Sequence, residues 1–358
     1  MTILSGICIF LLVISGFLMT CNRIRELKPF NRDTTDPLRG ILALLIVLHH
    51  ISLQIHIPLI GEFAQNLGIP IVSLFFLLSG YGLGISYLTK GSSYLNKFLS
   101  RRYSKILPSF LILTFIAIII DTLCGKKLSN QIHELVVNGE TPLPFSWFIY
   151  AIIYIYASFY VSAILGKNPR QTGLYLLGCN IIYILLTSIV GNYGFWWYVT
   201  IPSVNLGYYI AIYEKSLTSY IQKYPIIVYS TAIMMVFISI YGVTITPSLK
   251  YLPGLIWRGF WALNIAGGCY LIIRTLGLIR WKPLIWLSAI SMEIYLIHGL
   301  PIRSKFLFAG MSDILYVFFV YTLSIFTAWL IHKIINTKFI NFFKRTSSKS
   351  HAYTDSPK

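Results

Sequence analysis

Apolar segments separated by short polar ones run along almost the whole chain. Eleven of them are each close to the roughly 20 residues that a helix needs to cross the hydrocarbon core of a bilayer. They lie at about 3–20, 38–57, 69–88, 106–124, 145–165, 173–192, 195–213, 225–245, 254–275, 283–302 and 313–336. This pattern predicts an all-α polytopic membrane protein with about eleven transmembrane helices and the lipid bilayer as its surroundings.

Composition supports the same fold class. Hydrophobic residues make up 56% of the 358 residues and charged residues only 11%, too few to cover the surface of a soluble protein of this size. The formal net charge of +18 is typical of nucleic-acid binding, but the basic residues lie between apolar segments, as topogenic signals do, so no nucleic acid is expected. The five cysteines are scattered without paired spacing, which predicts neither a disulfide framework nor a metal site.

The distribution of basic residues predicts the orientation in the membrane. If the segment 21–37 is cytoplasmic, alternation of the spans puts 23 of the 29 Lys and Arg residues on the cytoplasmic side. The predicted outer side then holds Lys126, Lys127, Lys250, Arg258, Arg303 and Lys305. We therefore expect the N-terminus outside, with 3–20 retained as a helix, and the C-terminus in the cytoplasm.

The second span carries polar side chains that are unusual for a membrane helix. Arg39 stands at its predicted cytoplasmic end and His50 eleven residues later. At about 100° and 1.5 Å per residue, the two point from one face and lie some 16 Å apart along the axis, whereas His49 points about 80° away. A histidine within a membrane suggests a functional role. The alternative, of equal weight on chemistry alone, is an interfacial anchor and hydrogen bonds between helices.

Three further segments carry candidate chemistry. Arg101, Arg102 and Lys105 form a basic cluster that is either a lipid anchor or a phosphate site. Gly80 and Gly84 indicate close approach of another helix, and Trp147 and Phe148 fit an aromatic belt at the outer interface. In the tenth span, Ser291, Tyr295 and His298 share one stripe, and Glu293 lies on another face. A structural hydrogen-bond network and a catalytic role are both consistent with that last group.

Several of these residues belong to motifs that resemble acyltransferase family 3, membrane-integral enzymes that acylate sugars and other acceptors. The motifs, in the family's order, are Asp36-Pro-Leu-Arg39-Gly40 with His50, Phe75-Phe-Leu-Leu-Ser79-Gly80-Tyr81, Phe98-Leu-Ser-Arg101-Arg102-Tyr-Ser-Lys105-Ile-Leu-Pro108, Ser146-Trp147-Phe148 and Ile294-Tyr295-Leu-Ile-His298. Two positions depart from the family. Lys105 replaces an arginine, which loses bidentate phosphate binding, and Ser291-Met292-Glu293 replaces Ser-Tyr-Ser, which leaves the role of Glu293 unassigned.

The resemblance implies one integral-membrane domain over 1–340, made of an extra N-terminal helix and basic cytoplasmic loop (1–37) and a core (38–336), with a basic cytoplasmic tail at 341–358. It also implies location in the bacterial inner membrane. The implied reaction is transfer of an acyl group, usually acetyl, from cytoplasmic acyl-CoA to a hydroxyl of a cell-envelope glycan or glycolipid. A transporter with a proton relay and a glycan polymerase are the alternative functions.

The resemblance further implies a role for each candidate residue. Arg39 and the basic cluster would hold the CoA phosphates, and His50 would act as general base on the acceptor hydroxyl or itself accept the acyl group. The other expected roles are oxyanion stabilisation by Ser79 or Tyr81, orientation of the acceptor or base by Tyr295 and His298, and acceptor binding by Trp147 and Phe148.

Overall fold

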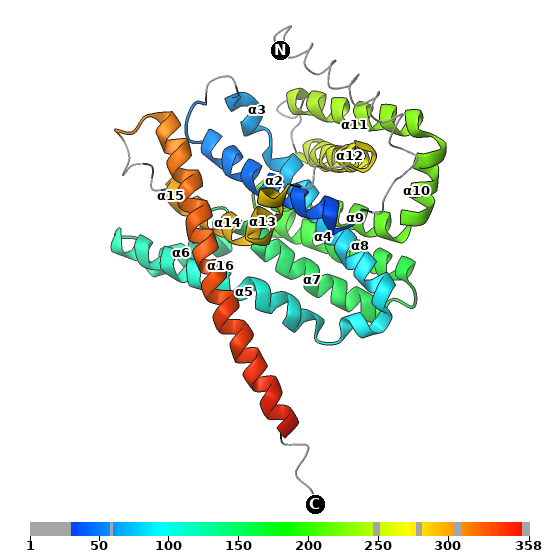
Figure 1. The fold of residues 1–358 in the computed structure, drawn as a ribbon. Coiled ribbons are helices and arrows are strands. Elements are labelled where there is room, and N and C mark those ends of the chain that lie inside the picture. Colours follow the sequence, from blue (N-terminus) through cyan, green and yellow to red (C-terminus); the bar gives the residue numbers. More distant parts are fainter. Residues whose placement is uncertain are drawn as a thin grey trace, which may run out of the picture.

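The computed structural model describes residues 30–57, 60–245, 251–276, 281–303, 305 and 310–352, and all regular structure in these ranges is helical (Figure 1). The α-helices are α2 (Arg32–Ser52), α3 (Gly61–Gln65), α4 (Gly68–Lys90), α5 (Phe98–Leu123), α6 (Leu128–His133), α7 (Trp147–Leu165), α8 (Pro169–Leu185), α9 (Pro202–Ile212), α10 (Glu214–Lys223), α11 (Pro225–Ile245), α12 (Tyr251–Leu276), α13 (Lys282–Ala289), α14 (Ser291–Ile297), α15 (Gly299–Arg303) and α16 (Asp313–Ala352). Short turns at Gly91–Leu95, Glu134–Asn138, Leu186–Val190 and Phe195–Trp197 complete the order. The predicted span at 3–20 lies outside the described residues.

The fold is an all-α polytopic membrane protein, and the described residues do not confirm the expected count of eleven spans. Within the described ranges, six helices are long and apolar enough to cross a membrane, or eight if two bent helix pairs each count as one span. The predicted span 195–213 is divided into a short 3₁₀ segment, Phe195–Trp197, and α9, whose 11 residues extend about 17 Å, too short to cross the bilayer alone. The predicted span 283–302 is also interrupted, because α13 and the helix that follows it are bent by 61°.

Helix α2 occupies the centre of the helix bundle (Figure 1) and contacts α4, α13 and α14. It begins after Asn31, whose side chain accepts a hydrogen bond from the Asp33 amide and caps the helix. Its one glycine, Gly40, lies against the backbone carbonyl of Leu284 in α13, so close that a Cβ atom at this position would overlap that oxygen. The small residue beside Arg39 therefore lets α13 approach α2 directly.

Helices α4 and α9 form another close pair, and glycines make it possible. Cβ atoms at Gly80 and Gly207 would overlap the carbonyl oxygens of Val204 and Leu77 respectively, and one at Gly84 would lie 2.7 Å from the Cβ atom of Ala211. The predicted close approach of another helix to Gly80 and Gly84 is confirmed. This contact fixes α4, which passes beside α2 and forms part of the wall of the cavity described below.

Replacement of Gly80 tests this packing, because a methyl group there meets backbone rather than a movable side chain. We expect Gly80→Ala to lower the midpoint of thermal unfolding in detergent. The matched control is Gly82→Ala in the same helix, where an added Cβ meets nothing within 4 Å and alanine raises helix propensity by up to about 1 kcal/mol. Equal melting temperatures for the two variants would contradict the close-packing argument.

Candidate active site

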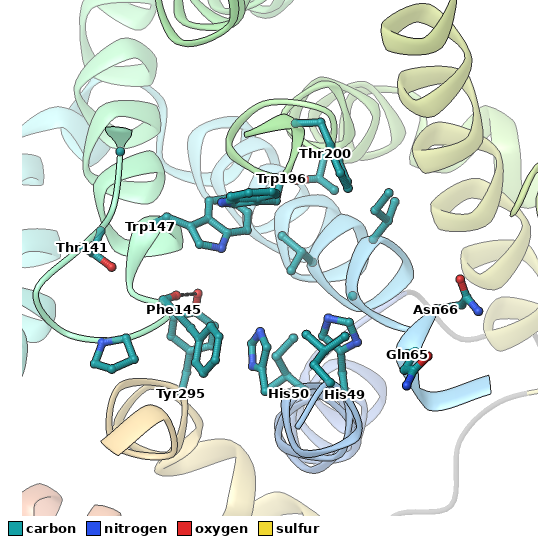
Figure 2. A pocket seen from close by; sticks show the side chains of 18 of the residues that line it. His49, His50, Gln65, Asn66, Thr141, Phe145, Trp147, Trp196, Thr200 and Tyr295 are labelled. Carbon is teal, nitrogen blue, oxygen red and sulfur yellow. Dashed lines mark hydrogen bonds between the residues drawn. The ribbon is translucent and has the colours of Figure 1, made fainter. Parts of the chain in front are cut away.

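A cavity of about 680 Å³ lies beside the C-terminal end of α2 (Figure 2). Its described lining comes from six parts of the chain: the end of α2 with the segment after it, the start of α4, the start of α7 with the segment before it, the segment before α9, α12, and Tyr295 of α14. The lining residues are Ile46, His49, His50, Leu53, Gln65, Asn66, Gly68, Ile69, Val72, Gly139, Glu140, Thr141, Pro144, Phe145, Trp147, Phe195, Trp196, Thr200, Arg258, Trp261 and Tyr295.

His50, which lines this cavity, meets a second histidine from a distant part of the sequence. The Nδ1 atom of His50 lies 2.7 Å from the Nε2 atom of His298, and both residues are buried. The other ring nitrogen of His298, Nδ1, lies 3.1 Å from the carbonyl oxygen of Ile294 one turn earlier. The structure therefore brings together the two histidines that the sequence analysis selected in separate spans.

The partners of these nitrogens determine where the protons lie in the neutral pair. A carbonyl oxygen can only accept, so Nδ1 of His298 carries the proton and Nε2 is left as an acceptor. His50 must then donate from Nδ1, which leaves its Nε2 atom unprotonated. Since His50 lines the cavity, its one free nitrogen is a proton acceptor available to a molecule bound there.

Phe145 packs against one face of the His50 ring. The two rings are stacked, with centroids 3.9 Å apart and planes 9° from parallel. Phe145 has a φ of 62°, a left-handed conformation that is strained for a bulky residue. Its carbonyl oxygen accepts a hydrogen bond from the Tyr295 hydroxyl (Figure 2), and its ring lies 3.1 Å from where a Cβ at Gly299 would be. Tyr295 and Gly299 thus fix the backbone that presents Phe145 to the histidine.

His49 also lines the cavity but belongs to a different contact. Its Nδ1 atom lies 3.0 Å from the carbonyl oxygen of Ala64 at the end of α3, and its Nε2 atom lies against Gly68. A Cβ atom at Gly68 would approach that nitrogen to 2.5 Å. His49 therefore connects α2 to the segment 61–68, while His50 contacts α14.

The basic residues gather at the opposite end of α2. Arg39 forms an ion pair with Asp36 at 3.2 Å, with 37% and 28% of the two side chains exposed, and its charge interacts with Arg102 and Tyr156. Arg102 donates to the Tyr94 hydroxyl at 2.5 Å, and its guanidinium lies 5.1 Å from the Tyr156 ring centroid. Because aromatic and hydroxyl groups rather than carboxylates hold Arg102, this cluster keeps excess positive charge.

Two members of the predicted basic cluster extend away from Arg39. Arg101 donates to the backbone oxygen of Tyr94 at 2.6 Å and is otherwise exposed. Lys105 is exposed and makes no hydrogen bond or ion pair within the described part of the chain. The structure thus brings Arg39 and Arg102 together, whereas Arg101 and Lys105 remain exposed at the surface.

Four other candidate residues lie outside the cavity lining. Ser79 donates to the Phe75 carbonyl in its own helix, and Tyr81 packs edge-on against Phe30. Phe148 is buried against Phe76 in the core, while its neighbour Trp147 lines the cavity. Glu293, which is 7% exposed, pairs with His332 of α16 at 3.0 Å. None of these four side chains is in a position to contact a molecule in the cavity, so their predicted roles there gain no support.

The sequence analysis did not select several residues that define the cavity, namely Phe145, Gln65, Asn66, Thr200 and Arg258. A left-handed phenylalanine has no sequence signature, and Arg258 was noted only as one of the few basic residues on the predicted outer side. Among the described residues, no group of three or more His, Cys, Asp or Glu side chains is arranged to hold a metal ion.

Comparison with known proteins gives one match. A family model described as an acyltransferase domain, that of acyltransferase family 3, covers residues 32–333. That range includes α2, the cavity lining and both histidines of the pair. No curated protein and no solved structure matches the chain.

The proton positions in the histidine pair can be measured directly. Spectra of protein labelled with ¹⁵N-histidine at neutral pH should assign the Nδ1–H tautomer to both His50 and His298. In His298→Leu the acceptor for His50 is lost, so the His50 resonances should change to a mixture of tautomers. The control, His49→Leu, should leave them unchanged. An Nε2–H tautomer at His50 in the unsubstituted protein would show that the hydrogen-bond assignment is wrong.

Proposed function

This chain belongs to acyltransferase family 3 and is a membrane acyltransferase; on that premise we propose that it moves an acyl group, most simply acetyl, from cytoplasmic acyl-CoA to a hydroxyl of a cell-envelope glycan or glycolipid at the bacterial inner membrane. The observation that carries the proposal is the His50–His298 pair, which leaves one unprotonated nitrogen of His50 in a cavity large enough for a sugar ring. Such a nitrogen is what O-acyl transfer needs as general base.

The donor enters from the side of Arg39 and Arg102. Coenzyme A carries several phosphate groups, and guanidinium groups bind phosphate oxygens through paired hydrogen bonds. The Arg39–Asp36 pair is more than a quarter exposed on both sides, so it contributes little stability and opens readily when a phosphate competes. The pantetheine arm then extends along α2, about 16 Å by helical rise, and brings the thioester to His50.

The acceptor binds in the cavity, which opens on the predicted outer side. Trp147 and Trp196 face His49 and His50 across it (Figure 2). Aromatic planes of this kind pack against the apolar faces of sugar rings, and the amides of Gln65 and Asn66 offer donors and acceptors to hydroxyl groups. An acceptor hydroxyl directed at His50 would lie next to the thioester carbonyl.

The reaction follows from this arrangement. The acceptor oxygen attacks the thioester carbonyl carbon while His50 Nε2 takes the hydroxyl proton. The resulting imidazolium keeps its Nδ1–H bond to His298, which stays neutral and orients the ring. When the tetrahedral intermediate collapses, the C–S bond breaks and His50 returns the proton to the leaving CoA sulfur. The ester and free CoA are the products, and Phe145 holds the His50 ring throughout.

Removal of His50 tests the assignment of the base. Purified protein in liposomes, supplied with radiolabelled acetyl-CoA and cell-envelope glycans, should incorporate label. His50→Ala should lower kcat by about 10²- to 10⁴-fold, the usual contribution of a general base. His49→Ala, which removes a neighbouring cavity histidine outside the proton relay, should retain most of the activity. Transfer at the original rate by a folded His50→Ala variant would rule out this base.

Replacement of Arg102 tests the donor site. A lost charge-assisted hydrogen bond costs about 1.5–3 kcal/mol, so Arg102→Ala should raise KM for acetyl-CoA by about 10- to 100-fold with a smaller effect on kcat. The control is Lys90→Ala, an exposed cation at the same predicted face of the membrane. If KM rises equally in both variants, or in neither, Arg102 acts only as a membrane anchor.

A further inference from the structure

A cation lines the predicted outer part of the cavity, and the acyl-transfer steps above do not use it. Arg258, in the first turns of α12, lines the cavity together with Trp261 one turn later. Its guanidinium lies 4.6 Å from the ring centroid of Phe195. Within the described residues it makes no hydrogen bond or ion pair. Its five N–H donors are therefore available to a molecule in the cavity.

The hydroxyl of Thr200 is also unused. Thr200 is only 2% exposed, its Oγ1 atom has no hydrogen-bond partner among the described residues, and the residue lines the cavity beside Trp196 (Figure 2). A buried hydroxyl without a partner costs roughly 1–3 kcal/mol, and this cost would be removed if the side chain turned the hydroxyl toward a ligand in the cavity. Thr200 belongs to the same segment as Phe195, over which the guanidinium of Arg258 lies.

The acidic groups nearby leave Arg258 unneutralised. Asp121 pairs with Arg303 at 2.8 Å, and Glu134 with Lys126 at 3.8 Å, both beside a separate, smaller cavity. Glu140 lines both cavities, but it is exposed and forms no ion pair with Arg258. The remaining titratable groups of the lining are engaged elsewhere: His49 with Ala64, His50 with His298, and Tyr295 with the Phe145 carbonyl. Among the described lining residues Arg258 is the permanent cation, and neither Glu140 nor any other described carboxylate is paired with it.

From these observations we propose that the acceptor is anionic, and that Arg258 and Thr200 form the subsite for its carboxylate or phosphate. Arginine suits either group because its planar fork matches two oxygens at once, and the Thr200 hydroxyl supplies a further donor. Trp147, Trp196 and Trp261 line the same space and would cover the faces of an adjoining sugar ring. The sugar ring in this inference rests on the proposed glycan acceptor. The negative charge rests only on Arg258 and Thr200.

The subsite also sets specificity. A guanidinium partly removed from water favours an acceptor with a negative charge over a neutral analogue, because the analogue would leave the charge of Arg258 uncompensated and the Thr200 hydroxyl without a partner. With the charge held near Arg258, the remaining hydroxyl groups of the sugar extend toward the histidine end of the cavity. Arg258 is in this sense a specificity-determining residue rather than part of the proton relay.

Direct binding to the full-length protein in nanodiscs tests the proposal without any acyl transfer. Tritiated probes are measured by scintillation proximity: methyl glucuronide for a carboxylate, glucose 1-phosphate for a phosphate, and neutral methyl glucoside. The unsubstituted protein should bind at least one charged sugar about tenfold or more tightly than methyl glucoside. The charged probe that binds better identifies the source of the negative group.

Variants then assign the preference to the subsite. Arg258→Gln should abolish the preference for the charged sugar and leave binding of methyl glucoside unchanged. Arg258→Lys should retain part of it, and Thr200→Val should weaken it severalfold. The matched control is Lys126→Gln, which removes a positive charge outside the main cavity on the same predicted side and should behave as the unsubstituted protein. Unchanged melting temperatures exclude misfolding as the cause.

The outcomes separate this inference from the proposed function. Equal affinity for charged and neutral sugars, no binding of either charged sugar, or an unchanged preference in Arg258→Gln would overturn the anionic subsite. Glycerol 3-phosphate serves as an anion without a sugar ring. If it binds in an Arg258-dependent manner as tightly as glucose 1-phosphate, the anionic subsite stands and the glycan acceptor fails.

Discussion

The hydrogen bond between His50 and His298 is the constraint on which the site depends. It joins residues 248 positions apart in the sequence, and both side chains are buried. An isolated imidazole among apolar groups would lack a partner for one nitrogen, whereas the chain from the Ile294 carbonyl through His298 satisfies three nitrogens and leaves one. The contact requires α14 to approach α2. Two features allow this approach: the bend between α13 and α14, and Gly40, whose lack of a side chain lets α13 pack directly on α2.

Helix α2 carries two different groups of functional side chains, a basic cluster and a pair of histidines. Its first turns carry a guanidinium in a cluster with Arg102 and aromatic rings, and its last turn carries the histidines that line the cavity. Arg39 is not among the cavity-lining residues, so the pantetheine arm of the proposed donor has to span about 16 Å along α2 to reach the cavity. This arrangement suits a reaction whose donor and acceptor come from opposite faces of the membrane. Each molecule binds near its own end of α2, and only the reacting atoms meet at His50.

Much of this was predictable because it depends on local pattern. Apolar segment length indicated a polytopic helical membrane protein, and helical spacing selected Arg39, His50, Tyr295 and His298. The same reasoning predicted regular spans at two places where the described structure has a bent or a short helix. Segment length cannot distinguish a straight helix from a bent pair such as α13 and α14, nor a full span from the short α9 packed against α4. The sequence analysis also selected Glu293 as a candidate site residue, but in the structure its partner is His332 on another helix.

The sequence by itself determined the fold class and which polar residues were unusual, because the cost of a charged or titratable side chain in lipid follows from its position within an apolar segment. Only the tertiary structure decided which of these residues meet. It paired His50 with His298, assigned Glu293 to a helix contact, and brought Phe145, Thr200 and Arg258 into the cavity. The left-handed backbone of Phe145 and the lack of an ion-pair partner for Arg258 among the described residues depend on distant segments, and no local pattern encodes them.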